Sequence, residues 1–485
     1  MITKSDYTNY LKCRSLYFLR KNHKELEAPL TVVEETNIHN GFLIQEYAQQ
    51  YFNDAYIIDR TNKSNQELYE ETIKLIKSGT KVICEASFIF EDLYCAVDIL
   101  KINDDKSIDI YEVKSAKDLN PVYYDDASFQ YYVLSKLGYK VNGVCLMHPS
   151  KTYTFKDELN IKEYFEFIDV DPKTNVEDNL KHIRATTCEQ KLIACSECKS
   201  CGFKEHCFKN VVKPNVLDLS GKVPKVKMFN EGIISFEDFL NSDYALINKD
   251  YIKSAIEQAE FEINDLPMKI DKDSVTKFLD SLVYPLYYLD FETVKDMFPF
   301  INGTTIAFPR IMQYSLHIQY EKGGKIEHLE YLQESKYDNL EEVADRLIKD
   351  LGTSGSILVY SSFENQKIKG LQKLVPSRSK DLELIRHRLV DMADPFKKRD
   401  VYTKELKGRY TIKYVLPVLC PEFEKAYASL PLVHNGGQID SAYEDLIKPN
   451  NPEHEFIKNS LLSYCELDTL AEVKIIEKLY EFIGK

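Results

Sequence analysis

The chain has 485 residues, of which 44% are hydrophobic, and carries a formal net charge of −14. This length exceeds one ordinary hydrophobic core and predicts two or three domains. No apolar run approaches the roughly 18 residues of a membrane span, and the first residues lack the apolar segment of a signal peptide, so we expect a cytoplasmic protein without a membrane partner. The negative charge argues against a generally basic surface for nucleic acid, although it allows a local basic groove.

Two helices are expected in the N-terminal region. The first, within residues 11–20, is basic and aromatic, and Cys13 precedes it. In the second, Glu46 lies within an apolar pattern, whereas His39 precedes the expected body of the helix.

A hairpin with two carboxylates and a lysine follows over residues 94–114. The midpoint of Asp98 and Glu112 is Asp105, which lies in a polar turn. Symmetric pairing of the two strands would set Asp98 opposite Glu112, with roughly 5 Å between their side-chain roots. Glu112 and Lys114 share one face because side chains alternate along a strand. Two acids that hold a metal beside an ammonium group can activate water and stabilise charge on a phosphate.

The chain contains 11 cysteines, and four of them crowd into one short segment, which indicates a metal site rather than disulfides. Four local thiolates would suffice for structural zinc, whereas an iron–sulfur cluster would combine three of them with a distant fourth, for which Cys13 is the candidate. Three other cysteines, Cys84, Cys95 and Cys188, are interpreted as buried or incidental thiols. The four crowded cysteines are Cys195, Cys198, Cys201 and Cys207.

Four features together resemble the RecB-like, PD-(D/E)XK nucleases that carry an iron–sulfur cluster, including those of CRISPR adaptation. They are the cysteine before the N-terminal helix, the hairpin, a following helix that contains Gln130, and the cysteine segment. The resemblance covers roughly the first 210 residues. In that family the cysteines pin the N-terminal helix to the C-terminal end of the domain. The implied cluster ligands, with a 4Fe–4S cluster expected ahead of zinc, are Cys13, Cys201 and Cys207 with either Cys198 or Cys195.

The same resemblance implies roles for the hairpin residues. Asp98 and Glu112 would bind the metal, Lys114 would act on the phosphate or the attacking water, and Gln130 would orient the site. Many relatives carry a His or Glu on the first long helix, so Glu46 is a candidate and His39 a weaker one.

A connector is expected over residues 213–281. The segment contains three prolines and two glycines. It also has the pattern of a small helical hairpin near residues 228–240, followed by a helical stretch near 246–282. The hairpin could touch a nucleic-acid backbone, but a plain pair of packing helices is the favoured interpretation.

A second strand-rich region begins at residue 284, where an apolar strand leads into Asp290 and Glu292. The alternating segments that follow predict a three-stranded antiparallel meander, then a helix over 338–351, a buried strand near 356–361 and a helix from 363. The chain ends in a long amphipathic helix, on which Tyr464 and Asp468 stand one turn apart.

This order of elements resembles the ribonuclease-H-like exonucleases of the DnaQ, or DEDD, family over about residues 282–485. Asp290 and Glu292 match the first motif of that family, and Tyr464 and Asp468 match its third. The resemblance implies that four carboxylates hold two divalent ions and that the tyrosine positions the attacking water. Glu364 would replace the usual Asp of the second motif, and Glu is also a competent oxygen ligand.

Three further polar residues, Arg388, Asp391 and Lys413, are interpreted as supporting or structural, with Arg388 and Asp391 paired at helical spacing. The whole chain is similar to a bacterial family, of undefined function, that fuses an iron–sulfur RecB-like nuclease to a DnaQ-like exonuclease.

The sequence therefore predicts an α/β multidomain protein with a PD-(D/E)XK nuclease domain over 1–212, a helical connector over 213–281 and a ribonuclease-H-like exonuclease domain over 282–485. We expect a Mg²⁺- or Mn²⁺-dependent nuclease with two active sites. Its expected substrate is DNA in preference to RNA, at single-stranded or frayed ends, and its expected partners belong to repair, defence or CRISPR adaptation. In one alternative only one domain cuts. In another the chain is a nucleic-acid-binding scaffold or complex subunit with degenerate sites.

Overall fold

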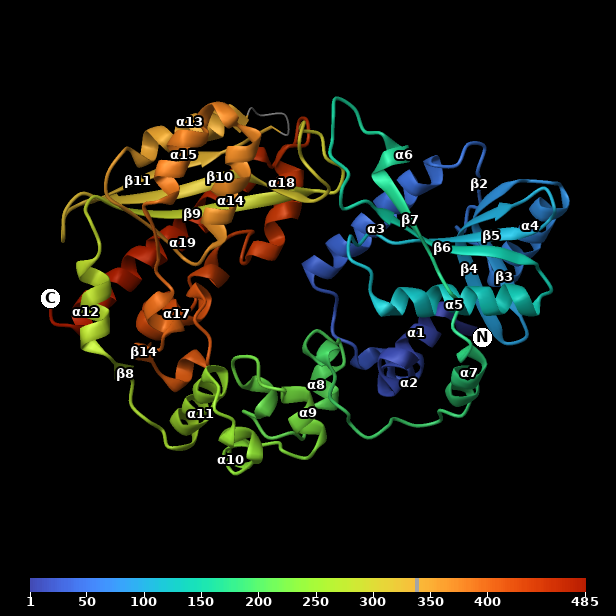
Figure 1. The fold of residues 1–485 in the computed structure, drawn as a ribbon, viewed down its shortest axis with the longest axis horizontal. Helices are drawn as coiled ribbons and strands as arrows, with labels where there is room; N and C mark the ends of the chain where they lie inside the picture. The colour runs from blue at the N-terminus through green and yellow to red at the C-terminus, as the bar shows by residue number, and fades with distance from the viewer. Residues whose placement is uncertain (336–339) are drawn as a thin grey trace. The chain divides into compact units, whose positions relative to one another are not determined.

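The computed structural model describes residues 1–335 and 340–485, which form two compact α/β units (Figure 1). Unit 1 comprises Met1–Asn210 and Met297–Ala307, and unit 2 comprises Val211–Asp296 and Phe308–Lys485. The segment expected as a separate connector thus lies in unit 2. No helix among the described residues combines the length and the apolar composition that crossing a membrane requires.

Unit 1 is built on one mixed sheet in the order β2-β3-β4-β5-β6-β7, with β1 paired to β4. The pairs β3–β4, β4–β5 and β6–β7 are antiparallel. The pairs β2–β3 and β1–β4 are parallel, as is the pair β5–β6, whose strands are connected through α5. The strands are β1 (Ile2–Thr3), β2 (Tyr56–Ile57), β3 (Val82–Phe90), β4 (Leu93–Ile102), β5 (Ile108–Val113), β6 (Val141–Pro149) and β7 (Phe165–Asp169).

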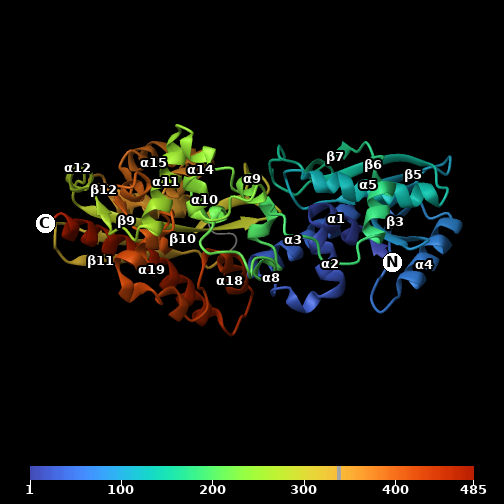
Figure 2. The same ribbon diagram turned by 90° about the horizontal axis from the view of Figure 1, so that it is seen from below.

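Two hydrophobic cores cover this sheet. Side chains of α1, α4, α5 and α7 pack with the sheet in one core, and α3 contributes Ile44 and Ala48 to the other. Figure 2 shows α1 and α5 side by side in this unit. The helices are α1 (Lys4–Lys12), α2 (Arg14–Asn22), α3 (Val32–Gln50), α4 (Asn65–Lys77), α5 (Pro121–Lys136), α6 (Ile161–Tyr164), α7 (Val176–Arg184) and α8 (Lys204–Cys207).

The β4–β5 hairpin has the expected register. Ile99 pairs with Tyr111 and Ile102 with Ile108, so the pairing is symmetric about residue 105. The Asp105 carboxylate accepts hydrogen bonds from the Ser107 backbone N–H at 3.0 Å and from its hydroxyl at 2.5 Å, which closes the polar turn. The sequence prediction of this hairpin is confirmed.

Unit 2 is built on a five-stranded sheet in the order β11-β10-β9-β12-β13. The first three strands form the expected antiparallel meander, and β12 and β13 add in parallel beside β9. A short two-stranded sheet pairs β8 with β14. The strands are β8 (Lys269–Ile270), β9 (Leu286–Asp296), β10 (Phe308–Gln319), β11 (Ile326–Leu332), β12 (Ser356–Val359), β13 (Leu389–Asp391) and β14 (Val401–Tyr402).

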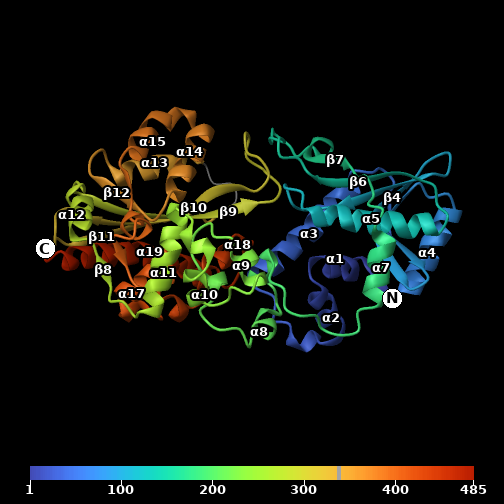
Figure 3. The ribbon, with the colours of Figure 1, turned by 60° about the horizontal axis from the view of Figure 1, so that its bottom comes forward.

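Helices cover both faces of this sheet, with α13, α14 and α15 on one face and the long α19 on the other (Figures 1 and 3). Buried residues of α19 pack with β9, β12 and α17 in the main core. The helices are α9 (Lys225–Asn230), α10 (Phe236–Leu240), α11 (Asp250–Ile263), α12 (Lys272–Asp280), α13 (Leu340–Leu351), α14 (Phe363–Leu374), α15 (Ser379–Arg386), α16 (Asp394–Lys397), α17 (Ile412–Leu419), α18 (Ile439–Leu446) and α19 (His454–Phe482).

Some expected helices differ from the structure. The stretch expected near 246–282 is interrupted, because β8 pairs with β14 between α11 and α12. The expected helix start at Asp338 lies outside the described residues, and α13 is described from Leu340. His39 lies inside α3 rather than before it, because the hydrogen bonds between Thr31 and Glu34 cap the helix at Val32.

Candidate functional sites

The hairpin of unit 1 brings Asp98, Glu112, Lys114 and Gln130 together, as the sequence predicts. Glu112 is almost fully buried, at 1% exposure, and accepts a hydrogen bond of 2.6 Å from the Gln130 amide. The Lys114 ammonium lies 2.5 Å from Glu112. The Asp98 carboxylate accepts the Val113 backbone N–H at 2.8 Å, which fixes it beside the end of β5.

Two residues of this site were missed from the sequence. Lys4, the first residue of α1, places its Nζ 3.1 Å from both oxygens of Glu112 and 3.7 Å from the Asp98 carboxylate. Asp126 on α5 accepts hydrogen bonds from Lys114 at 2.8 Å and from Gln130 at 3.2 Å. Asp126 lies one helical turn before Gln130, so helical spacing could have suggested it, whereas nothing local marks Lys4.

The charges in this cluster influence one another strongly. Burial and the Asp98 charge tend to raise the pKa of Glu112, but Lys114 and Lys4 outweigh them, so its pKa is lowered and the carboxylate stays ionised. Burial and then Glu112 raise the pKa of Asp126. The three carboxylates and two ammonium groups therefore form one coupled group beside the sheet.

Two adjoining pockets of unit 1 open onto Asp98. One, of about 280 Å³, is also lined by Glu112 and Lys114, and the other, of about 500 Å³, by Lys4 and the exposed Glu46 of α3. Both pockets are lined by Phe42 and Gln45. Asp98 is thus accessible from solvent-filled space, as a group that meets a ligand must be.

Glu85, a carboxylate on the strand next to Asp98, was also missed from the sequence. The β3–β4 register sets Glu85 opposite Asp98, because Cys84 pairs with Ile99 and Ala86 with Val97. Glu85 has φ of +62°, a strained backbone conformation for this residue type. Its carboxylate accepts a hydrogen bond from Arg60 at 2.7 Å and another from Gln45.

In unit 2 the structure brings Asp290, Glu292 and Asp468 together. Each offers an oxygen atom, and these atoms lie within 4.8 Å of one another, a spacing that one metal ion can bridge. Burial raises the pKa of Asp468 to about 6, although a hydrogen bond from Tyr427 and the charge of Lys413 act in the opposite direction. Burial and then the neighbouring carboxylates raise the pKa of Asp290 well above its usual range.

Two tyrosines border this acidic group. Tyr464 is buried, and its hydroxyl oxygen accepts a hydrogen bond from Lys413 at 2.9 Å. Tyr427, which the sequence did not single out, donates a hydrogen bond of 2.6 Å to Asp468. Lys413 therefore supports the site through Tyr464.

Glu364 lies at the start of α14, close enough for its charge to raise the pKa of Asp290, but it does not belong to the set within 4.8 Å. Burial and then Asp391 raise the pKa of Glu364 to about 8. A fifth carboxylate near this group, Glu472, lies one turn after Asp468 on α19 and was missed from the sequence. Glu364 and Glu472 each have one buried oxygen without a hydrogen-bond partner, which suits a divalent cation as the missing partner.

The expected pairing of Arg388 with Asp391 is wrong, because this segment is a strand rather than a helix. Arg388 donates to backbone carbonyls of the 351–355 loop, including Gly355 at 2.8 Å. Asp391, at the end of β13, accepts the Ser361 and Ala393 N–H groups at 3.0 and 2.9 Å. Arg388 therefore braces the loop before β12, and Asp391 braces the segment that leads from β12 to Glu364.

The cysteine segment lies in the same unit as Cys13. The Sγ atoms of Cys195 and Cys198 are 3.2 Å apart, and Cys13 interacts electrostatically with Cys198, Cys201 and Cys207. A hydrogen bond of 2.9 Å from the Ala28 N–H to the Gly202 carbonyl links the N-terminal region to the segment. Within residues 1–335 and 340–485, no cysteine belongs to a group of three ligand atoms as compact as that of Asp290.

The three cysteines interpreted as buried or incidental thiols differ in their exposure to solvent. Cys84 and Cys95 are buried, as expected, and Cys188 is exposed.

Comparison with known proteins gives one family match. A comparison with curated proteins finds no match to this chain. Residues 287–411, which include Asp290, Glu292 and Glu364 but not Asp468, match the model of a domain of unknown function (DUF2779).

Proposed function

We propose that the protein is a metal-dependent nuclease that hydrolyses phosphodiester bonds, with DNA as the favoured substrate. The observation that carries this proposal is the group of Asp290, Glu292 and Asp468, whose oxygen atoms converge within 4.8 Å. Three converging carboxylates, of which Asp468 is buried and the other two are half-buried, repel one another, and a divalent cation such as Mg²⁺ or Mn²⁺ offsets that repulsion. A bound ion of this kind supplies charge neutralisation at a phosphate and a lower pKa for attacking water.

The topology of unit 2 supports a ribonuclease-H-like fold of the DEDD type. The order β11-β10-β9-β12-β13, with an antiparallel meander and two parallel strands, places the D-x-E strand at the centre of the sheet. The helix with the Y-x3-D motif packs against that strand. In this proposal the Tyr464 hydroxyl, held by Lys413, orients a water molecule for attack.

The topology of unit 1 supports a PD-(D/E)XK fold in the same way. Three antiparallel strands, the α5 crossover and the parallel β6 carry Asp98, Glu112, Lys114 and Gln130 to one place. Asp98 and Glu112 would hold the metal, and the Lys114 ammonium would stabilise charge on the phosphate. Glu85, whose backbone is strained, lies on β3 opposite Asp98, and backbone strain beside a site fits a functional role for these strands.

A second candidate is a nuclease in which only unit 2 cuts. Lys4 and Lys114 already neutralise the carboxylates of unit 1, whereas the compact three-oxygen group of the described residues lies in unit 2. In that version unit 1 would bind the nucleic acid.

The test is a cleavage assay on labelled single- and double-stranded DNA and RNA with Mg²⁺ or Mn²⁺. Each of Lys114→Ala and Asp468→Asn should lower the rate of its own site by about 100- to 1,000-fold, the usual cost of removing one charge-stabilising group. Lys101→Ala, on the same hairpin, and Asp280→Asn, an exposed residue, are the matched controls.

The outcomes separate the versions. Loss of activity only in Asp468→Asn assigns cleavage to unit 2, and loss only in Lys114→Ala assigns it to unit 1. A wild-type protein that binds nucleic acid and never cleaves it with either metal would identify a scaffold and defeat the nuclease proposal.

We also propose that Cys13, Cys201 and Cys207, with Cys198 or Cys195, hold an iron–sulfur cluster, supported by the electrostatic proximity of Cys13 to the segment. Anaerobically purified protein should be brown and contain iron, and Cys13→Ser should lose most of it. The control Cys188→Ser, an exposed cysteine of the same region, should keep its iron. Colourless protein with stoichiometric zinc would contradict the cluster.

A further inference from the structure

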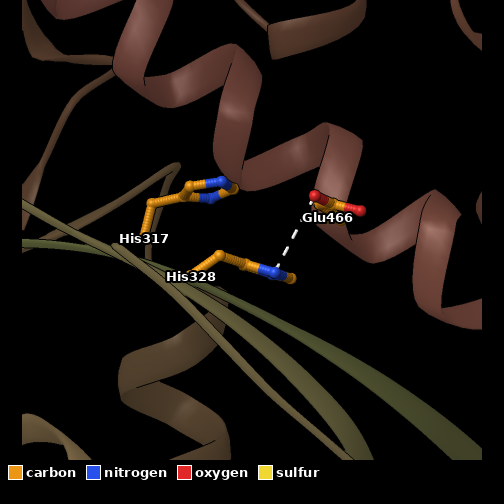
Figure 4. Close-up of side chains that lie close together, drawn as sticks. All are labelled: His317, His328 and Glu466. Carbon is orange, nitrogen blue, oxygen red and sulfur yellow. Dashed lines mark ion pairs between the residues drawn. The ribbon is translucent and has the colours of Figure 1, made fainter. Parts of the chain in front are cut away.

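A second group of side chains that can serve as metal ligands lies on the α19 face of the unit 2 sheet (Figure 4). His317 of β10 and His328 of β11 are direct cross-strand partners, and Glu466 comes from α19. One ligand atom from each residue lies within 4.8 Å of the other two. The two imidazole rings stack with centroids 4.6 Å apart, and Nδ1 of His328 lies 3.8 Å from a Glu466 oxygen.

Hydroxyl groups hold one nitrogen of each imidazole ring. The Thr469 hydroxyl lies 2.8 Å from Nδ1 of His317, and the Ser315 hydroxyl lies 2.9 Å from Nε2 of His328. The two hydroxyls are themselves 2.7 Å apart. The opposite nitrogens, Nε2 of His317 and Nδ1 of His328, are thus left for a ligand, as in metal sites where an outer hydrogen bond orients each histidine.

We propose that His317, His328 and Glu466 bind a divalent transition-metal ion of the Zn²⁺ class. Two imidazoles and one carboxylate are a ligand set that suits Zn²⁺ and its neighbours, whereas the oxygen-only group of Asp290 suits Mg²⁺ or Mn²⁺. Glu466 has a side-chain exposure of 48%, which leaves the ion's fourth position open to water.

The placement of the ligands gives this ion a structural role. It joins the last two strands of the meander to α19, the helix that also carries Tyr464 and Asp468. Its outer hydrogen bonds involve Ser315, the cross-strand partner of Asp290, and Thr469, the residue after Asp468. The ion therefore fixes α19 against the sheet beside the acidic group, whether or not that group cuts nucleic acid.

The experiment titrates the full chain with Zn²⁺ alone and, in parallel, with Co²⁺ alone as a spectroscopic probe. His328→Ala and Glu466→Gln each remove one ligand. The control His387→Ala removes a histidine that is 73% exposed and lies outside the group. Thermal melts of the metal-free proteins check that each variant folds, and the half-exposed position of Glu466 makes its variant the safer of the two.

Wild type and His387→Ala should bind one more equivalent of Zn²⁺ than the two ligand variants, or bind it about 100-fold more tightly. The additional Co²⁺ should lack the thiolate charge-transfer absorption that cysteine ligands produce, which separates this ion from metal at the cysteine segment. Equal stoichiometry and affinity in all four proteins, or thiolate absorption from every bound Co²⁺, would overturn the proposal.

Discussion

At the scale of single residues, the two carboxylate groups differ in how their negative charge is offset. In unit 1, Lys4 and Lys114 lie directly against Glu112, and the pKa of Glu112 is lowered. In unit 2, burial and mutual repulsion raise the pKa of Asp290 and Glu292. The first group is stabilised by protein cations, and the second relies on a bound cation in the function proposed above.

Lys4→Ala should lower the stability of unit 1 by about 1–3 kcal/mol, the usual cost of leaving a buried charged group without its partner. The Lys4 side chain is three-quarters buried and its ammonium lies 3.1 Å from Glu112, so solvent screens the interaction only in part. Urea unfolding followed by circular dichroism measures the loss. Lys12→Ala, at an exposed position of the same helix, should change stability by only a few tenths of a kcal/mol, and equal losses in both variants would contradict the prediction.

At the scale of elements, the central strand of unit 2 depends on a close approach of two backbones. Gly355 precedes β12 with φ of +89°, and a Cβ added there would lie 2.1 Å from the Pro285 carbonyl oxygen, next to β9. Gly232 has nearly the same φ, +90°, but nothing lies within 4 Å of its added Cβ. Alanine substitutions at these two glycines therefore separate the cost of backbone strain from the cost of steric overlap.

Gly232→Ala should cost about 1–2 kcal/mol, the penalty of a left-handed conformation for an L-residue. Gly355→Ala should cost about 3 kcal/mol or more, because the parallel pairing of β12 with β9 must also shift. Calorimetric melting of both variants measures the difference. A similar drop in melting temperature for the two variants would contradict the prediction, because it would show that the overlap with Pro285 is removed at little cost in free energy.

At the scale of the whole molecule, unit 1 includes a segment that lies between two strands of unit 2 in the sequence. In the segment Met297–Ala307, the Phe298 ring stacks on Tyr47 with centroids 3.9 Å apart and lies 5.2 Å from Tyr164. The Tyr164 hydroxyl donates a hydrogen bond of 2.9 Å to the Met297 carbonyl. Unit 1 is therefore completed by residues from the second half of the chain.

Phe298→Ala should destabilise unit 1 by about 1–3 kcal/mol, because a half-buried aromatic ring loses its packing and ring contacts. Hydrogen exchange should show faster exchange in α3 and β7. Leu384→Ala, at a position that is 64% exposed in unit 2, is the control and should leave these elements unchanged. Protection lost only in unit 2 would contradict the assignment of this segment.

Local features of this protein could be predicted from its amino-acid sequence. The hairpin register and the antiparallel meander follow from the alternation of side chains and from turn residues. The same alternation places Asp290 and Glu292 on one face of their strand. These patterns act over a few residues. Even so, a local pattern misplaced the start of α3 and the pairing of Arg388, where capping and strand formation prevailed.

Contacts between residues far apart in the sequence, in contrast, became visible in the three-dimensional structure. Lys4 reaches Glu112 across more than one hundred positions, Tyr427 reaches Asp468, and His317 and His328 meet Glu466 of the last helix. No periodicity encodes these contacts, because they depend on how helices pack on each sheet and on which backbone amides and hydroxyls orient the side chains. Sequence spacing thus set the local pattern, and packing set the charge and ligand environment of each site.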